Sequence, residues 1–359
     1  MVRLKPKLLI QWRAKRKFCV VRLGLCLIVF LSSVVLGLPT DAEAVEAEPS
    51  QAIIVIGASG TDEYFDDFKV WAYRWQAAFP ESMNARIIGD RDEVASAVSD
   101  VSHSSRQQIL EWIEDGEKSE DRERWLILIG HGTYQLKVAN FNAVGPDLSA
   151  DDLANAISAC PARWRIVVCA SSSAPFLNAL SGPNRVIVTA TKSGSEQNFS
   201  RFGDYLSQSI MAPTSDLDHD GSVSILEAFV VASGNLAKWY ADEGRIASEQ
   251  ALIDDNGDQR GTPANFFRGV RAAKAPVEGS KMDGTLARRV YVREHTAFTS
   301  LTETQQLKIV ELENEIEAHR LRKQEFSEAE YFAKLETYLV ELAHLLVPSE
   351  MESTSRVPP

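Results

Sequence analysis

Short runs of apolar residues alternate with stretches of mixed polarity through the middle of the chain. Four of these runs are continuous, which is typical of parallel strands that are buried on both faces. They cover residues 52–56, 125–129, 165–169 and 185–191. We therefore predict a central, mostly parallel sheet built from these segments.

Helices are predicted between and after these strands. Thr61 is a suitable N-cap for the helix after the first strand, because its hydroxyl can accept a backbone N–H. Ser149, with Asp152 three residues further on, has the spacing of a capping box, and residues 199–210 have the pattern of another helix. Strands that alternate with helices predict a three-layer α/β/α sandwich, with its chemistry beyond the carboxyl ends of the strands.

The C-terminal part of the chain has a different pattern. Residues 260–300 are predicted to form an extended connection, because 260–284 is rich in Gly, Ala, Pro and basic residues. Capping-box spacings at Thr302 and Ser327 then predict an antiparallel helical hairpin over 301–347, followed by a disordered tail at 348–359. The apolar stripes of the hairpin are Ile309, Leu312 and Ile316 on the first helix and Tyr331, Leu335, Leu339, Leu342 and Leu346 on the second.

The first 44 residues are organised like an export signal. Eight basic residues precede an uncharged apolar run at 23–38, and Ala42-Glu43-Ala44 offers small side chains to a signal peptidase. The run is short for a bilayer-spanning helix, which needs about 20 residues. We expect a cleaved signal peptide at 1–44, a linker at 45–51 and an exported (periplasmic or extracellular) protein. The alternative is a membrane anchor through residues 18–38.

The composition narrows the class of partner. The chain has 359 residues and is 45% hydrophobic, which allows one sizeable core with a smaller attachment. Its net charge is −12, and loss of the leader, with eight basic and two acidic residues, makes it more negative. A surface this acidic argues against nucleic acid as a partner. A membrane would be contacted only through an uncleaved leader.

Two of the predicted strands end in chemically suggestive residues. His131 lies between glycines directly after the strand at 125–129, and Ser171 lies two residues after the strand at 165–169. A histidine and a hydroxyl at neighbouring strand ends can serve as base and nucleophile, and a glycine N–H such as that of Gly132 can receive an oxyanion. The plainer interpretation is a turn histidine bonded to backbone beside a capping loop of serines.

The order of these motifs resembles the caspase-like peptidases, and most closely the legumain family. His131-Gly132 matches the family's histidine motif, and Ala170-Ser171 stands where those enzymes have alanine and their nucleophilic cysteine. The strand and turn at 186–194 resemble the strand that follows in the family. The resemblance covers residues 52–245 and implies a caspase-like domain, which we place at 52–259. It also implies that a peptide or protein ligand would bind in the strand-end cleft.

The chain departs from the family at the positions that matter for catalysis. Ser171 replaces the nucleophilic cysteine, and Cys169 lies two residues earlier, on the same face of the chain if the strand continues. A dyad that depends on a thiolate does not simply accept a hydroxyl, because the pKa of serine lies far above that of cysteine. The acidic Asp62-Glu63 replaces the basic pair of the legumain specificity pocket. An asparagine preference is therefore not expected to carry over, and the sequence leaves enzyme activity uncertain.

A twelve-residue segment at 216–227 matches the calcium-binding loop of an EF-hand. Aspartates fill positions 1, 3 and 5, glycine fills position 6 and glutamate fills position 12, which is the oxygen shell that Ca²⁺ prefers. The alternative is an acidic turn that caps the next helix. Pro213 indicates that the incoming helix is missing or offset, so we expect a structural ion. The predicted ligand residues are Asp216, Asp218, Asp220, Ser222, Ser224 and Glu227.

A second acidic segment lies at 254–258. It contains Asp254, Asp255, Asn256 and Asp258 but has no glutamate at the matching distance, so a solvated turn is the simpler interpretation. Whether it contributes to a metal site is left open by the sequence.

Three functions are compatible with these features. The first is an exported, non-peptidase protein of caspase-like fold with a calcium-binding loop. The second is an active endopeptidase or other hydrolase that uses His131 with Ser171, or with Cys169. The third is an interaction or scaffold protein that acts through its helical hairpin.

Overall fold

The computed structural model describes residues 51–90, 104–115, 122–277, 281–292 and 301–346. The predicted signal peptide at 1–44, the anchor at 18–38, most of the linker and the tail at 348–359 lie outside the described residues. Within the described ranges, no helix combines the length and apolar character that crossing a bilayer requires.

The centre of the described chain is a seven-stranded sheet in the order β10-β9-β8-β7-β3-β1-β2. Five strands of this sheet run parallel, namely β2, β1, β3, β7 and β8. Strand β9 pairs antiparallel with β8, and β10 pairs antiparallel with β9. The four predicted strands correspond to β1, β3, β7 and β8. The bounds are β1 Gln51–Ile56, β2 Arg86–Ile88, β3 Glu123–Ile129, β7 Arg163–Cys169, β8 Val186–Thr189, β9 Leu252–Asp254 and β10 Thr262–Pro263.

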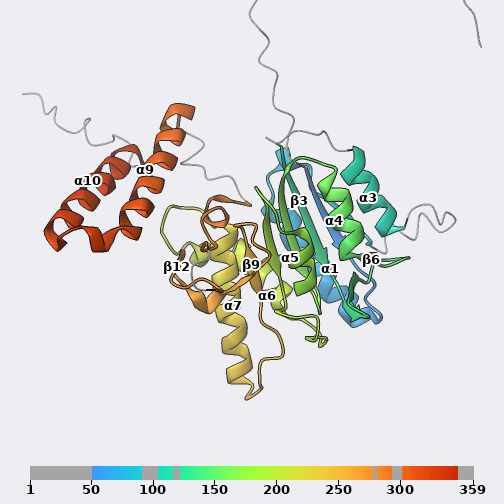
Figure 1. Cartoon of the computed structure of the whole chain (residues 1–359). Helices are drawn as coiled ribbons and strands as arrows, with labels where there is room; N and C mark the ends of the chain where they lie inside the picture. The colour runs from blue at the N-terminus through green and yellow to red at the C-terminus, as the bar shows by residue number, and fades with distance from the viewer. Residues whose placement is uncertain (1–50, 91–103, 116–121, 278–280, 293–300, 347–359) are drawn as a thin grey trace, which may run out of the picture. The chain divides into compact units, whose positions relative to one another are not determined.

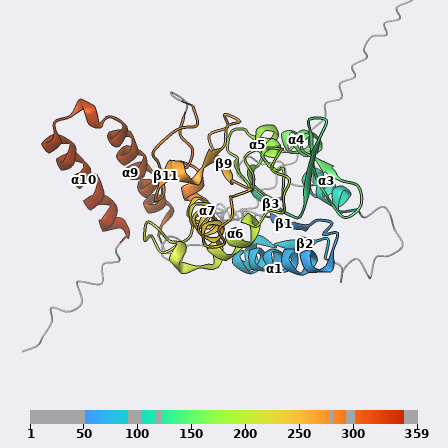
Figure 2. The same ribbon diagram turned by 90° about the horizontal axis from the view of Figure 1, so that it is seen from below.

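Helices cover both faces of this sheet (Figures 1 and 2). One layer consists of α3 (Ser105–Asp115), α4 (Ala150–Ser158) and α5 (Ala174–Leu180), and the other of α1 (Asp62–Ala78), α6 (Phe202–Met211) and α7 (Ile225–Asp242). Successive residues of β1 alternate between the two cores, with Ile54 and Ile56 facing α1 and α6 and with Ile53 and Val55 facing α3 and α4. The predicted three-layer α/β/α sandwich is confirmed.

Local capping sets the start of most helices, but not of α6. Thr61 accepts the Tyr64 N–H at the start of α1, and Ser149 accepts the Asp152 N–H at the start of α4, as predicted. The helix predicted at 199–210 begins only at Phe202. Its first N–H groups are capped from a distance by the buried carboxylate of Glu249, which accepts the N–H groups of Arg201 and Phe202. A cap that is distant in sequence leaves no local signal.

A small antiparallel sheet begins where β3 ends and was not predicted. It consists of β4 (Gly132–Gln135), β5 (Val138–Phe141) and β6 (Leu148–Ser149). Phe141 of β5 is fully buried in the core on the α4 side. The hairpin formed by β4 and β5 therefore holds the residues after β3 against the body of the protein.

The connection predicted at 260–300 is more structured than expected. It contains β10, a 3₁₀ turn at Ala264–Phe266, the two-stranded sheet of β11 (Phe267–Arg268) and β12 (Arg271–Ala272), and a 3₁₀ turn at Ala287–Arg289. We name residues 281–292 the strap. Its Ala287, Val290 and Val292 are buried in the core on the α7 side. Small and basic residues suggested an extended connection, but these few apolar positions anchor it to the core.

The C-terminal hairpin consists of α9 (Glu303–Leu321) and α10 (Glu328–Leu346). Thr302 with Gln305, and Ser327 with Glu330, form the predicted reciprocal caps. Ile309, Leu312, Ile316 and Tyr331 are buried, whereas Leu339 and Leu346 of the predicted second stripe are exposed. Arg289 of the strap forms an ion pair with Glu313 of α9 at 3.0 Å.

Candidate functional site

The ends of β3 and β7 bring the predicted histidine and serine segments together. The two strands pair in parallel with Ile129 opposite Cys169, so the residues that follow leave the sheet side by side. The Gly130 N–H donates to the Cys169 carbonyl at 3.2 Å. A Cβ atom on Gly132 would overlap the carbonyl oxygen of Ser171. Gly132 therefore allows the two strand ends to approach this closely. A side chain at this position would prevent the approach.

His131 is held by aromatic rings and by one backbone carbonyl. Its ring lies edge-on to Tyr64 and Phe68, with centroid distances of 5.1 and 5.3 Å, and 6.0 Å from the centroid of Phe199. Its Nε2 lies 3.1 Å from the Ser59 carbonyl oxygen. A carbonyl only accepts hydrogen bonds, so in the neutral ring Nε2 carries the proton and Nδ1 has the free lone pair. The residues after β1 thus fix the orientation of the imidazole.

The three serines after β7 differ in their surroundings. Ser173 Oγ lies 3.1 Å from Thr191 Oγ1, and the Thr191 N–H donates to Ser173 Oγ, so this serine ties the ends of β7 and β8 together. Ser172 has a φ of +55°, and its N–H donates to the Glu196 carbonyl at 2.8 Å. Ser171 is buried, and in the described part of the chain no hydrogen bond joins its side chain to His131.

Cys169 points away from these strand ends into the hydrophobic core. It packs among apolar residues on the α1 and α6 side of the sheet, and the space for a Cβ atom on Gly203 lies only 2.8 Å from its own Cβ. Burial, and secondarily the charge of Glu249, raises the pKa of this thiol far above its ordinary value. A thiol in this environment stays protonated, which is unfavourable for a nucleophile.

A cavity of about 560 Å³ is lined in part by the segment that hydrogen-bonds to residues 171–173, which we name the serine loop. Lys192 and Glu196 line it from the segment after β8, and Glu196 is the residue whose carbonyl accepts the Ser172 N–H. Helix α7 and the segment before β9 contribute most of the other lining residues. The remaining lining residues are Val230, Ser233, Gly234, Leu236, Ala237, Tyr240, Ala247, Glu249, Gln250, Ala251, Ala264 and Asn265.

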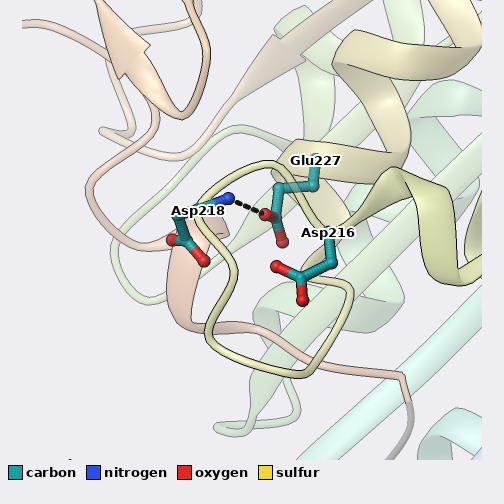
Figure 3. Close-up of side chains that lie close together, drawn as sticks. All are labelled: Asp216, Asp218 and Glu227. Atoms are coloured by element: carbon teal, nitrogen blue, oxygen red, sulfur yellow. Dashed lines mark hydrogen bonds between the residues drawn. The ribbon is translucent and has the colours of Figure 1, made fainter.

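The predicted calcium loop lies between α6 and α7. Helix α6 ends at Met211 and a 3₁₀ turn at Pro213–Ser215 follows, so the incoming helix is offset, as Pro213 indicated. Carboxylate oxygens of Asp216, Asp218 and Glu227 lie within 4.8 Å of one another (Figure 3). These three side chains can form the core of a cation site.

The other predicted ligands complete the loop. Asp216 accepts the N–H groups of Asp220 and Gly221, which closes the turn around its carboxylate. Asp220 accepts the Ser222 N–H through one oxygen and the Tyr291 hydroxyl through the other. Ser224 is the N-cap of α7 and forms a capping box with Glu227.

Glu227 connects the loop to the helix. One of its oxygens accepts the N–H groups of Leu217 and Asp218, and the other accepts the Ser224 N–H. Figure 3 shows the bond from Asp218. Burial within the loop, followed by the charges of Asp220 and Glu227, raises the pKa of Asp218 to about 7. The loop in this state holds several like charges close together, and a bound cation would relieve their repulsion.

The sequence did not predict the part of the site that comes from the strap. Tyr291 contacts Asp220 and forms an antiparallel bridge with Ser224, and the Ile225 N–H donates to the Val290 carbonyl. Burial, followed by the charge of Asp220, raises the pKa of Tyr291. A single tyrosine far along the chain offers no sequence signal for such a contact.

Comparison with known proteins identifies no family for this chain. No protein-family model and no curated protein matches the chain. Among solved structures, the chain is similar to the Drosophila initiator caspase Dronc, with 11% identity and a TM-score of 0.33. That similarity covers 61% of this chain and 86% of the Dronc chain.

The close approach at Gly132 generates a first prediction. Gly132→Ala should lower the free energy of unfolding by roughly 1–3 kcal/mol, because the new methyl group overlaps the Ser171 carbonyl. Urea unfolding of both proteins measures the difference. Gly234→Ala in α7 is the matched control, since no atom lies within 4 Å of its new methyl group, and it should be neutral or stabilising by up to about 1 kcal/mol. Equal midpoints for wild type and Gly132→Ala would contradict the packing argument.

Proposed function

We propose that this protein is an exported, calcium-braced α/β protein of caspase-like type that binds a peptide or protein at its strand-end cleft without cleaving it. The observation that carries the proposal is the state of the two groups in the catalytic positions. His131 is oriented by the Ser59 carbonyl, yet its neighbour is a buried serine with no hydrogen bond to it among the described residues. The order of the motifs, which resembles that of the caspase-like peptidases, supports a ligand cleft at this point.

The chemistry of the two groups argues against hydrolysis. An imidazole with a pKa near neutrality leaves almost all of a serine hydroxyl protonated unless the two groups are closely aligned. Cys169 offers no substitute, because its thiol is buried in the core and its pKa is raised. The cavity beside the serine loop remains available to a ligand side chain, with apolar walls and with Lys192 and Glu196 at one side.

One observation favours the alternative, a working hydrolase. The Ser59 carbonyl leaves Nδ1 of His131 as the free base, which supplies the orienting group that the sequence did not reveal. Catalytic hydrogen bonds often tighten only when substrate binds. A serine or cysteine hydrolase is therefore the outcome against which the binding function has to be tested.

The second prediction concerns catalysis. The mature protein should show no turnover of asparaginyl, aspartyl or arginyl peptides and no labelling by probes for reactive hydroxyls or thiols, with or without calcium. Ser171→Cys alone should not create activity, because Asp62 and Glu63 replace the family's basic specificity residues. Turnover that is lost in both His131→Ala and Ser171→Ala would overturn the proposal. Turnover lost in His131→Ala and Cys169→Ala, but kept in Ser171→Ala, would identify the thiol as nucleophile.

The calcium part of the proposal rests on the loop of Asp216, Asp218, Asp220, Ser222, Ser224 and Glu227. The buried Glu227 and the clustered oxygens of Asp216 and Asp218 support it. Because the loop caps α7 and contacts the strap, we propose that the ion braces the fold and is not a switch. Extracellular calcium modules bind at about 10⁻⁴–10⁻³ M.

The third prediction follows from this affinity. Calcium at 10 mM should stabilise the folded protein by about 1.4–2.7 kcal/mol through mass action, measured as a higher Tm than in chelator. Glu227→Gln should remove the part of this increase that comes from the loop at 216–227, and Asp242→Asn at the exposed end of α7 should keep it.

The pH dependence of the same experiment has a definite sign. The folded pKa of Asp218 is raised to about 7, above its unfolded value near 3.9, so this group favours the folded state below the unfolded pKa. That contribution is lost as the pH rises through 7. Calcium must displace the proton, so the increase in Tm should be larger at pH 8 than at pH 6. An increase of equal size at both pH values would contradict this assignment of Asp218.

A second candidate function uses the helical hairpin. Leu339 and Leu346 of the predicted stripe are exposed on α10, together with Phe332 and Val340. Exposed apolar side chains on one helix are compatible with docking of a partner protein. Binding that survives in the full chain but is lost when residues 301–359 are deleted would favour the hairpin over the strand-end cleft.

The fourth prediction concerns export. The charge step and the short apolar run of the leader predict cleavage near Ala44 and a mature protein outside the cytoplasm. Intact-mass measurement of the exported protein should give a chain that begins close to residue 45. A full-length, membrane-retained product would instead favour the anchor at residues 18–38.

A further inference from the structure

The segment that begins at Asp254 has positive φ at the same two positions as the proposed calcium loop. In the loop that begins at Asp216, the fourth and sixth residues have positive φ, +61° at His219 and +91° at Gly221. In the segment that begins at Asp254, the fourth and sixth residues again have positive φ, +77° at Gly257 and +65° at Gln259. A glutamine rarely adopts this conformation, so the repeat is imposed by the turn and not by the residue type.

The two segments also share two of their internal hydrogen bonds. The fifth N–H donates to the third side chain in both, from Asp220 to Asp218 at 3.3 Å and from Asp258 to Asn256 at 2.9 Å. The seventh N–H donates to the fifth side chain in both, from Ser222 to Asp220 and from Arg260 to Asp258. Asp254, Asn256 and Asp258 therefore occupy the first, third and fifth positions of a loop like the first one.

Two buried oxygen atoms in the second segment lack a partner. Asp254 is only 1% exposed, and its Oδ1 accepts the Gly257 N–H at 3.0 Å, which turns the carboxylate into the loop. Within the described residues, Asp254 Oδ2 and Asp258 Oδ2 are buried and have no hydrogen-bond partner. Burial raises the pKa of Asp254, with an opposing contribution from the Ser181 hydroxyl. Buried, unpaired carboxylate oxygens are costly unless a cation satisfies them.

The loop is held rigidly from outside. Ser181 Oγ accepts the Gln259 N–H at 2.9 Å, and the Asn178 side-chain amide donates to the Gln259 carbonyl at 2.7 Å. Asp255 is not available as a ligand, because its carboxylate accepts the N–H groups of Gly284, Leu286 and Ala287 in the strap. The free oxygens of Asp254 and Asp258 are thus the groups left to meet a ligand.

We infer that residues 254–258 form a second divalent-cation site, with Asp254 and Asp258 as charged ligands and Asn256 as a neutral oxygen ligand. Calcium is the expected ion, because the donor set consists of hard oxygens on a short loop. The site has two carboxylates, and the exposed Asn265 stands at its twelfth position where the first loop has Glu227. Fewer charges predict weaker binding than at the first loop.

The fifth prediction is a stoichiometry. Isothermal titration calorimetry of the mature chain, with every residue after the leader retained, should show two calcium sites. Asp258→Asn should remove the weaker site, Glu227→Gln should remove the stronger one, and the double variant should bind none. Asp258→Asn keeps an oxygen that can accept the Arg260 N–H, so the turn should be retained, and circular dichroism checks this. Asp254→Asn is a second variant that should also remove the weaker site. Asp242→Asn on α7 is the control and should retain both sites.

The outcomes separate this inference from the proposed calcium loop. One site that is lost in Glu227→Gln and kept in both Asp258→Asn and Asp254→Asn would overturn the second site and leave the first. One site that is lost in Asp258→Asn and kept in Glu227→Gln would support the second site and overturn the first. Two sites that both survive in Asp258→Asn and Asp254→Asn would also overturn the inference.

Discussion

The parallel pairing of β3 with β7 is the constraint on which the candidate site depends. Its register sets Ile129 opposite Cys169, so both strands end at the same level and the segments after them leave the sheet together. Backbone contact at Gly132 then fixes how closely the two segments approach. The same register turns Cys169 toward the α1 and α6 core, because side chains alternate between faces along a strand. A shift of one residue would exchange the thiol with its neighbours and destroy this arrangement.

Buried carboxylates perform a second structural task, which is to satisfy backbone N–H groups far away in sequence. Glu249 caps α6, and Glu227 joins the acidic loop to the start of α7. Asp255 and Asp283 exchange hydrogen bonds between the segment after β9 and the strap, with Asp283 accepting the Asp255 N–H and Asp255 accepting the Gly284 N–H. Hydrogen bonds to charged acceptors are stronger than neutral ones, so a few of them hold irregular segments in place. Both acidic segments also contact the strap, through Tyr291 and through Asp255.

At the strand ends, His131 is oriented as a base would be and has a serine next to it where a thiolate would be needed. The Ser59 carbonyl settles the tautomer, while the aromatic rings of Tyr64, Phe68 and Phe199 restrict the imidazole. Glu196 lines the neighbouring cavity and accepts the Ser172 N–H, so it links the cavity to the serine loop. Because no hydrogen bond joins this hydroxyl to His131 among the described residues, we propose binding without cleavage.

The sequence by itself determined the layers of the fold, most helix starts and the first acidic loop, because apolar runs, capping residues and the DxDxDG spacing are local patterns. It also placed His131 and Ser171 after neighbouring strands. It could not determine that α6 begins at Phe202, that residues 281–292 are anchored, or that Ser59 orients His131, because each depends on a partner distant in the chain. Tertiary structure alone decided which way Cys169 points and which oxygens of Asp254 and Asp258 remain unpaired. Burial and orientation follow from the packing of whole elements, and no short segment encodes them.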